Sequence, residues 1–323
     1  MELTDIYAPV SRELVKVEQK LKSLGEVDFP HLAELVNYSL TSTGKMLRPA
    51  LTFLSGTFFD YEKNVDLIVG TASGIEVMHI ATLVHDDAID HSDTRRGRTT
   101  VYKLWGEEQA VLLGDYLFAV AGQMIADTGN LRVVRKFSST LETISHGEIN
   151  QAHNSYNLNQ TRDDYYERIS RKTAALFLMS TEAGAVLSGA PENSIRALMD
   201  FAFNLGIGFQ IVDDILDFVG TEEQLGKPVG SDLKQGTLTL PSFMILEKYP
   251  GDNPVKKLFE NRGGQAEIDK AVDIIKNSTI VQECYDVARQ YCEKASKALQ
   301  PLPPVQSRDC LEEMTNYVMR RNR

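Results

Sequence analysis

Two groups of aspartates in this chain share one spacing and one setting. They are Asp86, Asp87 and Asp90 in DDAID, and Asp213, Asp214 and Asp217 in DDILD. Each group ends a long apolar run, and residues four apart lie on one helix face, where like charges repel by about 0.2 to 0.5 kcal/mol. Apolar surroundings add a cost for burying charge. Because Mg²⁺ prefers a few carboxylates plus substrate phosphates, the pattern predicts two Mg²⁺-binding clusters, with solvated helix ends as the alternative.

An anionic substrate also needs cations, and several stand at turns near the acidic groups. Arginine suits bidentate phosphate contacts, and lysine supplies a compact point charge. A helix start with free backbone amides favours phosphate as well. Taken singly, each of these cations is more often a solvated surface charge. The candidates are Lys45 and Arg48 in TGKMLRP, Arg95 and Arg96 in TRRG, Lys172 in RKTAALF, and Lys227 in GKPVGSD.

Three uncharged side chains lie one or two helical turns before the aspartates. His79 is seven residues before Asp86 on the same face, so its imidazole can donate to a phosphate; a satisfied core histidine is the alternative. Phe209 and Gln210 precede Asp213 by one turn. An aromatic face stabilises a nearby cation by about 0.5 to 2 kcal/mol, although packing alone would also explain Phe209.

Composition limits the class of protein. The chain has 323 residues, 42% of them hydrophobic, and a net charge of -11, which predicts a soluble globular protein that repels nucleic acid and anionic membranes. The apolar run 67–84 contains Glu76 and His79, so it predicts a buried helix rather than a membrane span. No leader pattern opens the chain, which predicts a cytoplasmic protein. The three cysteines lack metal-ligand spacing and predict free thiols.

Apolar residues recur at spacings of three and four residues throughout, so the fold class is predicted to be all-α. No linker divides the chain, so a single domain over residues 1–323 is predicted. Residues 91–103 and 220–241 are expected to be long, functional connections. The basic end, Arg320 to Arg323, is expected to be solvated. The predicted helices span 3–24, 30–41, 45–59, 63–90, 106–128, 130–153, 163–188, 192–219 and 238–249, with several more to about 320.

Together these motifs resemble the polyprenyl synthetase family of trans-isoprenyl diphosphate synthases, from TGKMLRP to DLKQGTLTLP and more weakly to the end. Paired DDxxD motifs, RRG after the first, RKT between them and GK after the second all match in order. The resemblance implies an isoprenoid-synthase bundle of helices around a central cavity, a homodimer or a partner subunit, and three Mg²⁺ ions per site with substrate bound.

The resemblance also implies roles for individual residues. The six aspartates would hold Mg²⁺ against the diphosphate of an allylic substrate, and the second substrate would be isopentenyl diphosphate. Phe209, Thr173 and Gln210 would stabilise the allylic cation formed before condensation. The allylic diphosphate would be contacted by Arg95, Lys172, Thr173, Gln210 and Lys227, and isopentenyl diphosphate by Lys45, Arg48, His79 and Arg96.

The chain departs from the family pattern at a few positions. Thr43 and Met46 replace a glycine and an arginine of the family pattern. Thr237 replaces a common lysine, so one diphosphate contact is expected to be lost or to pass to a neighbour such as Lys234. Small side chains at Ala81 and Thr82, below the first motif, resemble enzymes with long products, because short-chain members place bulky aromatics there.

Other functions remain open at this stage. A short-chain synthase or the catalytic subunit of a two-component synthase would share much of this pattern. A noncatalytic subunit is disfavoured, because such subunits usually lack intact acidic motifs and both are intact here. A class I terpene cyclase is disfavoured because its second metal motif differs from DDILD. An HD-type phosphohydrolase would use the doublet His85 and Asp86, but it leaves the second acidic group without a role.

Overall fold

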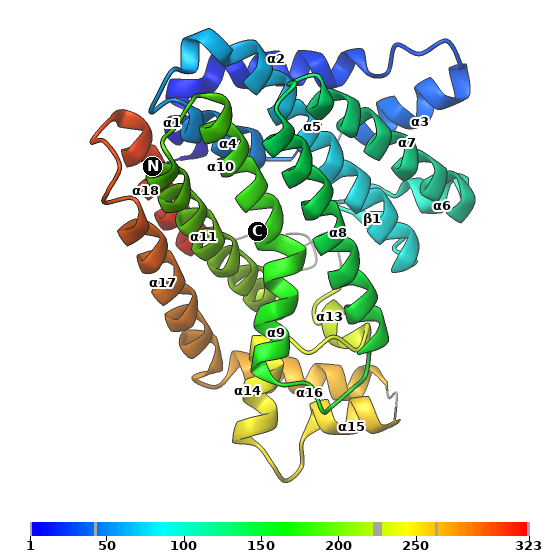
Figure 1. The fold of residues 1–323 in the computed structure, drawn as a ribbon. Coiled ribbons are helices and arrows are strands. Elements are labelled where there is room, and N and C mark those ends of the chain that lie inside the picture. Colours follow the sequence, from blue (N-terminus) through cyan, green and yellow to red (C-terminus); the bar gives the residue numbers. More distant parts are fainter. Residues whose placement is uncertain (1, 42–43, 222–227, 262–263, 322–323) are drawn as a thin grey trace. The chain divides into compact units, whose positions relative to one another are not determined.

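The computed structural model describes residues 2–41, 44–221, 228–261 and 264–321, and it confirms the all-α prediction (Figure 1). The elements are α1 (Leu3–Ile6), η1 (Ala8–Val10), α2 (Ser11–Ser23), α3 (Pro30–Leu40), α4 (Leu47–Gly56), α5 (Tyr61–Ile89), β1 (Thr94–Arg95), β2 (Arg98–Thr99), α6 (Val101–Trp105), α7 (Glu107–Ala126), α8 (Leu131–His153), α9 (Arg162–Ile169), η2 (Ser170–Ala174), α10 (Ala175–Leu187), α11 (Glu192–Val219), α13 (Ser231–Lys234), α14 (Leu240–Lys248), α15 (Pro254–Asn261), α16 (Gln265–Lys276), α17 (Ile280–Ala298) and α18 (Gln306–Arg320).

Local chemistry explains where the helices differ from the prediction. The expected helix over 3–24 is interrupted at η1, which contains Pro9, because proline has no amide hydrogen to donate. The connection 91–103 contains a small hairpin, β1 and β2, and the short helix α6. Its turn residues Arg96 and Gly97 have φ of +52° and +75°, the left-handed pair that a two-residue hairpin turn requires.

Two predicted helix ends are confirmed. Thr161 caps α9: its hydroxyl accepts from the Asp164 amide, while the Asp164 carboxylate accepts from the Thr161 amide at 2.8 Å. Gly189, with φ of +75°, follows the end of α10, and α11 begins at Glu192, directly after Pro191. The expected helix over 163–188 contains an unexpected π-helical turn, η2, which carries Lys172 and Thr173.

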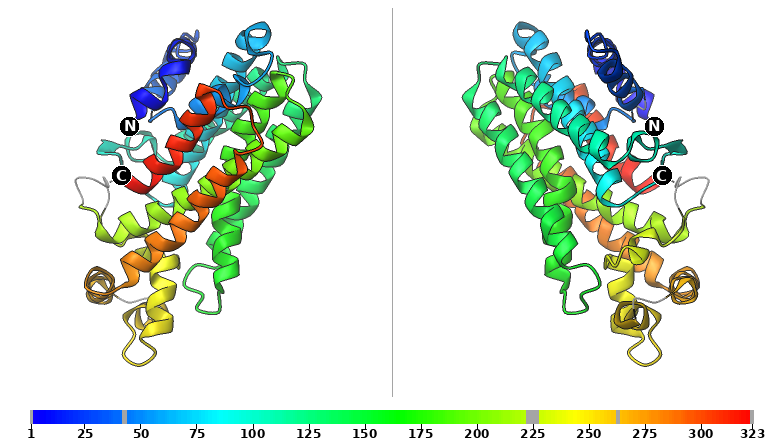
Figure 2. Two further views of the ribbon diagram at one scale, coloured as in Figure 1. Left: turned by 90° about the vertical axis from the view of Figure 1, so that its left-hand side faces the viewer. Right: turned by 90° about the vertical axis from the view of Figure 1, so that its right-hand side faces the viewer.

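The chain forms two compact units, each made of three segments. Unit 1 comprises residues 1–141, 176–202 and 296–314. In it α5 and α7 lie side by side (Figures 1 and 2). Gly74 permits this approach, because a Cβ there would lie 3.2 Å from the Ala121 carbonyl oxygen. A Cβ at Gly184 would likewise collide with the Thr52 carbonyl, so α10 contacts the backbone of α4 directly.

Unit 2 comprises residues 142–175, 203–295 and 315–323. Within it α14, α15 and α16 pack together, shown in yellow to orange in Figure 1. The part of α11 that belongs to unit 2 approaches η2 closely near Gly206. A Cβ at Gly206 would lie 2.7 Å from the Ala174 Cα. This contact holds the π-helical turn against the helix that carries the second aspartate motif.

Three described helices, α5, α7 and α11, are long and apolar enough to cross a membrane by length and composition. The apolar window of α5 is 78% buried inside the protein, which confirms a buried helix there. The corresponding window of α7 is only 39% buried. All three cysteines are buried and free, as predicted, and burial raises the pKa of Cys284 and Cys292 to about 12.

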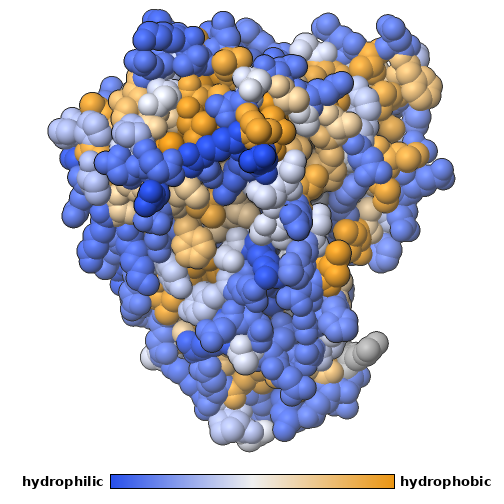
Figure 3. Space-filling view, in the orientation of Figure 1, coloured by the Kyte–Doolittle hydropathy of each residue, from blue (hydrophilic) through white to orange (hydrophobic). Residues whose placement is uncertain are grey.

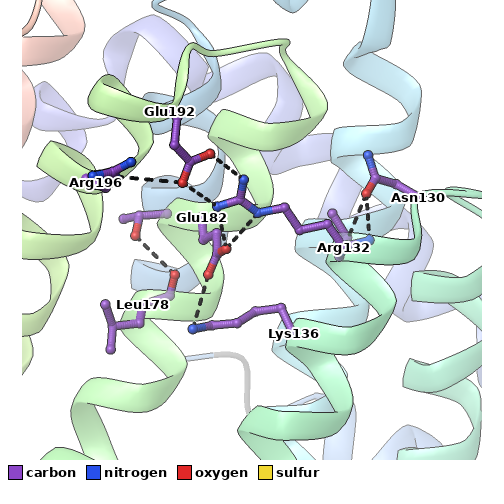
Figure 4. Close-up of polar contacts among 9 residues, drawn as sticks. Asn130, Arg132, Lys136, Leu178, Glu182, Glu192 and Arg196 are labelled. Atoms are coloured by element: carbon purple, nitrogen blue, oxygen red, sulfur yellow. Dashed lines mark hydrogen bonds and ion pairs between the residues drawn. The ribbon is translucent and has the colours of Figure 1, made fainter.

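A charged network joins α8, α10 and α11 within unit 1 (Figure 4). Glu182, on α10, is 7% exposed and lies 2.9 Å from an Arg132 nitrogen and 3.1 Å from Lys136 Nζ. Arg132 also pairs at 2.7 Å with Glu192, in the first turn of α11. The Asn130 side chain caps α8 by accepting from the Arg132 amide at 3.0 Å. One buried carboxylate therefore serves two cations.

Replacing Glu182 by Gln should lower the free energy of unfolding by about 1 to 3 kcal/mol, because Arg132 and Lys136 would keep their charges without this partner. Urea titration followed by circular dichroism measures the change. The matched control is Glu192→Gln, whose half-exposed carboxylate should contribute less than about 1 kcal/mol. Equal losses in the two variants would contradict this account of the network.

Candidate active site

The first aspartate motif lies at the carboxyl end of α5 in unit 1. Asp86 and Asp87 are in its last turn, and Asp90 is the C-cap. Asp87 is buried and accepts a hydrogen bond from Arg95 Nε at 2.7 Å. Burial raises the pKa of Asp87, while the Arg95 charge opposes that shift. Asp90 is exposed and Asp86 is part-buried, so both are more accessible than Asp87.

The β1–β2 hairpin returns two arginines to this helix. Arg95 lies on β1 and reaches Asp87, and Arg96 lies in the left-handed turn. The Arg96 guanidinium packs against Gly44, where a Cβ would lie 2.8 Å from its Nη1. The structure therefore brings Arg96 to the segment that carries Lys45 and Arg48. Lys45 is exposed, and Arg48 lies in the first turn of α4 with its guanidinium over the Phe177 ring.

His79 lies near these arginines. Burial, followed by the charges of Arg48, Arg96 and Arg95, lowers the pKa of His79 well below its usual value. Its imidazole is therefore neutral near pH 7 and carries one N–H that can donate to an anion. Arg48, Arg96 and Arg95 therefore lie close enough to His79 for their charges to lower its pKa, and its anion-binding role stays a prediction.

Glu76 was missed by the sequence analysis as a member of this group. It lies three residues before His79 on α5 and is 3% exposed. Burial raises its pKa, and the charges of Arg48 and Arg96 oppose the shift. Its Oε2 atom has no hydrogen-bond partner within the described residues. An acidic residue within an apolar run, one turn from a histidine, was the signal that could have identified it.

His85, next to the first motif, faces α7. Its Nε2 lies 2.9 Å from the Val111 carbonyl oxygen, and its ring packs on Phe118. A Cβ on Gly114 would occupy the space of this ring. The His85 ring therefore contacts several residues of α7, and its Nε2 also lies 3.7 Å from Oδ1 of Asp115 on that helix. This orientation removes the histidine that an HD-type phosphohydrolase would need as a metal ligand.

The second aspartate motif lies in the last turns of α11 in unit 2. Asp214 is 3% exposed and accepts from Tyr165 Oη at 2.7 Å and from Gln210 Nε2 at 2.8 Å. Burial and the charge of Asp232 raise the pKa of Asp214 to about 7, against the effect of those hydrogen bonds. The sequence analysis did not select Asp232, although it follows GKPVGS closely.

Asp217 completes this buried acidic end. It accepts from Ser231 Oγ at 2.8 Å and from the Asp232 amide at 3.2 Å. The segment 228–236 is thereby attached to the helix, and the Gly230 amide also donates to the Asp217 carbonyl oxygen. Lys227, the remaining predicted diphosphate ligand, lies outside the described residues.

The π-helical turn η2 carries two predicted substrate-binding residues. It places Thr173 beside α11 and Lys172 beside α8. Thr173 Oγ1 donates to Gln210 Oε1 at 2.5 Å, and Lys172 Nζ lies 2.7 Å from Glu148 Oε1. Gln210 accepts from Thr173 and donates to Asp214, so its amide has one fixed orientation. Such π turns occur often at functional sites. Neither the turn nor the Glu148 contact was predicted.

The prediction of a solvated basic end is wrong for Arg321. Its side chain is buried, and Nη1 lies 2.8 Å from Asp213 Oδ1. The guanidinium also stacks on the Phe209 ring, with Cζ 3.6 Å from the ring centroid. A part-buried anion on α11 and a buried cation after α18 neutralise each other, which sequence position alone did not indicate.

The donors of both motifs are carboxylate oxygens, the ligand type that Mg²⁺ takes. Among the described residues, no three acidic, histidine or cysteine side chains are close enough to hold a metal by themselves. Mg²⁺ generally keeps water and takes substrate phosphate oxygens as further ligands. The convergence of the two motifs on one substrate stays a prediction.

Asp214 should make stability depend on pH in metal-free buffer. Its folded-state pKa of about 7 lies above the ordinary value of 3.8, so its contribution is complete below about pH 4 and is lost as pH rises through 7. Between pH 5.5 and 8.5 this loss amounts to about 2 kcal/mol. Urea unfolding of Asp214→Asn should lack this component, whereas the exposed Asp200→Asn on the same helix should retain it. Parallel profiles for wild type and Asp214→Asn would contradict the assignment.

Comparison with known proteins places these motifs in a family. A family model described as polyprenyl synthetase matches residues 29–275. The chain is 37% identical over 325 residues to heptaprenyl diphosphate synthase component 2 of Geobacillus stearothermophilus, with 100% of each covered.

Solved structures agree over the whole length. Heptaprenyl diphosphate synthase from Staphylococcus aureus has a TM-score of 0.92 and 35% identity, covering 97% of this chain and 98% of that one. Polyprenyl synthase from Caulobacter crescentus CB15, complexed with calcium and isoprenyl diphosphate, has a TM-score of 0.94 and 30% identity, covering 100% and 98%. Since the matched residues include both aspartate motifs, the chain belongs to the polyprenyl synthetase family.

Proposed function

We propose that this protein is a Mg²⁺-dependent prenyltransferase that condenses isopentenyl diphosphate with an allylic diphosphate in successive trans additions. One observation carries the proposal: both DDxxD motifs are intact in a chain that matches the family along its full length. Bound Mg²⁺ would supply charge neutralisation on the departing diphosphate. Asp86, Asp90 and Asp213 are the most accessible carboxylates of the two motifs and would provide its protein ligands.

The chain's own residues would divide the two substrates between them. Arg95 and Lys172 each already pair with a carboxylate, and each can transfer hydrogen bonds to an anionic allylic substrate. The cations Arg48 and Arg96 and the neutral N–H donor His79 form the group proposed for isopentenyl diphosphate, with the exposed Lys45 on the same segment as Arg48. Lys227 is proposed for the allylic diphosphate by resemblance alone.

The allylic cation needs an aromatic face and oxygen atoms held in place. The Phe209 ring binds a guanidinium at 3.6 Å in this structure, so its face is able to accept a cation. Gln210 is locked between Asp214 and Thr173, which fixes its amide oxygen on the Thr173 side. No protein nucleophile is required, because the new bond forms between the two substrates.

A long-chain product is proposed over a short one. The relatives in Geobacillus and Staphylococcus are named for a heptaprenyl product. On α5, Thr82 is part-buried and shares a face with Asp86, four residues on, while Ala81 is fully buried. Ala81 falls on the stripe of α5 that includes Gly74 and His85, both of which contact α7. Neither small side chain would block a hydrocarbon chain growing along this helix.

A second chain is proposed to cover the outer face of α7. Exposed apolar side chains on α6 and α7 include Leu104, Val111 and Leu112. Figure 3 shows apolar atoms at the surface where Figure 1 labels these helices. The partner is proposed to be a second copy; a different subunit is the alternative, because the Geobacillus relative is named component 2. The single-domain organisation and the cytoplasmic location also stay proposals.

The purified chain, given Mg²⁺, isopentenyl diphosphate and an allylic diphosphate primer, should release diphosphate and form polyprenyl products. Mass spectrometry of the dephosphorylated products detects new carbon–carbon bonds directly. Chelator should abolish the reaction, and Asp86→Ala or Asp213→Ala should slow it by at least about a hundredfold. The control is Asp200→Ala, an exposed aspartate on α11, which should keep wild-type activity.

Each alternative predicts a different result in this assay. Phosphate release without a longer hydrocarbon product would favour a phosphohydrolase. Elongation that occurs only after a partner subunit is added would indicate a two-component synthase. Elongation that proceeds unchanged in metal-free buffer would remove the proposed mechanism.

Replacing Ala81 or Thr82 by Phe should shorten the product, because either ring would obstruct the path of the growing chain. The fully buried Ala81→Phe should also lose about 1 to 3 kcal/mol of stability by overpacking against α7, so Thr82→Phe is the cleaner test. The matched control is Ala266→Phe, at an exposed position of α16. Product mass spectra identical to wild type in both Phe variants would refute this path along α5.

A further inference from the structure

Arg321 makes more contacts with the second aspartate motif than a surface tail would. Its Nη1 lies 2.8 Å from Asp213 Oδ1, and its Nη2 donates to the Phe209 carbonyl oxygen. The guanidinium carbon lies 3.6 Å from the centroid of the Phe209 ring. The side chain is only 3% exposed. One guanidinium thus binds a carboxylate, a carbonyl and an aromatic face at once.

The spacing of α11 creates this arrangement. Phe209 and Asp213 are four residues apart, so both side chains lie on one helix face and a single cation can reach them. The fit is incomplete, because Arg321 Nε is buried and has no hydrogen-bond partner among the described residues. Burying an N–H without a partner opposes the contact, so the charge of Asp213 and the ring are what retain it.

The two groups that Arg321 covers are both assigned to the reaction. Asp213 is the proposed metal ligand, and Phe209 is the ring proposed to stabilise the allylic cation. We propose that Arg321 is an internal counter-cation that occupies Asp213 in the metal-free protein and must give up this carboxylate when Mg²⁺ binds. The inference rests on the proposed function in one respect, namely that Asp213 is a metal ligand.

Electrostatics sets the direction of the effect. A guanidinium and Mg²⁺ on the same carboxylate repel each other, and the repulsion is stronger beside the buried Arg321 guanidinium than in bulk water. Metal binding must therefore displace Arg321, and removing its charge must tighten metal binding by roughly tenfold or more. Because Arg321 directly follows α18, its release also frees the end of that helix.

Arg321→Met tests the first consequence, since it removes the charge and keeps an unbranched side chain. The matched control is Arg320→Met, which removes the same charge from the exposed neighbour. Binding of Mn²⁺, used in place of Mg²⁺ and without substrate, can be measured on the full chain by electron paramagnetic resonance of the free ion. Arg321→Met should bind Mn²⁺ at least roughly tenfold more tightly than wild type, and Arg320→Met within about twofold of it.

Hydrogen exchange tests the second consequence without any variant. Amides of residues 315–321 in the wild-type chain should exchange faster when Mg²⁺ is added, and Asp213→Asn should show the faster rate before any metal is present. Exchange that Mg²⁺ leaves unchanged would overturn the proposal, as would equal Mn²⁺ affinities for wild type and Arg321→Met. If neither protein binds the metal, the inference fails, because no ion then competes with Arg321 for Asp213; the proposed function is judged separately by the elongation assay with both substrates.

Discussion

The central constraint in this protein is the burial of carboxylates at the ends of apolar helices. Asp87, Asp214 and Asp217 are all 6% exposed or less. A buried carboxylate needs hydrogen bonds or a cation, because the charged form is costly in apolar surroundings. The surrounding elements meet this need in different ways: a hairpin supplies Arg95 to Asp87, and a helix supplies Tyr165 to Asp214. The loops near the motifs are therefore part of the acidic clusters.

The partners differ in kind between the two motifs, which gives the two ends different chemistry. Asp87 is matched by a full positive charge, whereas Asp214 is matched by a phenol and an amide. Burial and the charge of Asp232 raise the pKa of Asp214 to about 7, and the hydrogen bonds from these neutral donors offset only part of the shift. Thr173, Gln210 and Asp214 form a chain of hydrogen bonds in which each member orients the next. The amide oxygen proposed to face an allylic cation is thus positioned by a carboxylate.

The sequence was sufficient for features that depend on local spacing. The helical class, the capped start of α9 and the break at Gly189 follow from side-chain and backbone preferences within a few residues. Family motifs indicated the diphosphate and metal candidates, whose roles stay predictions; the structure places Arg48 and Arg96 near His79.

Features that depend on distant segments could not be predicted in this way. The ion pair between Arg321 and Asp213 joins residues that are 108 positions apart in the sequence, and no local sequence pattern predicts it. The hairpin is too short for its alternation to be recognised, since each strand has two residues. The π-helical turn depends on the close approach of Gly206 to Ala174. Glu76 was read only as a charge that argues against a membrane span.

The burial of all three cysteines has a practical consequence for spectroscopy. Alkylating reagents react with the thiolate, which forms least readily when burial raises the thiol pKa, as it does for Cys284, Cys292 and Cys310. A cysteine introduced at an exposed position would therefore be modified far faster than the native ones. A fluorophore or spin label can be attached there selectively, in the otherwise unaltered polypeptide.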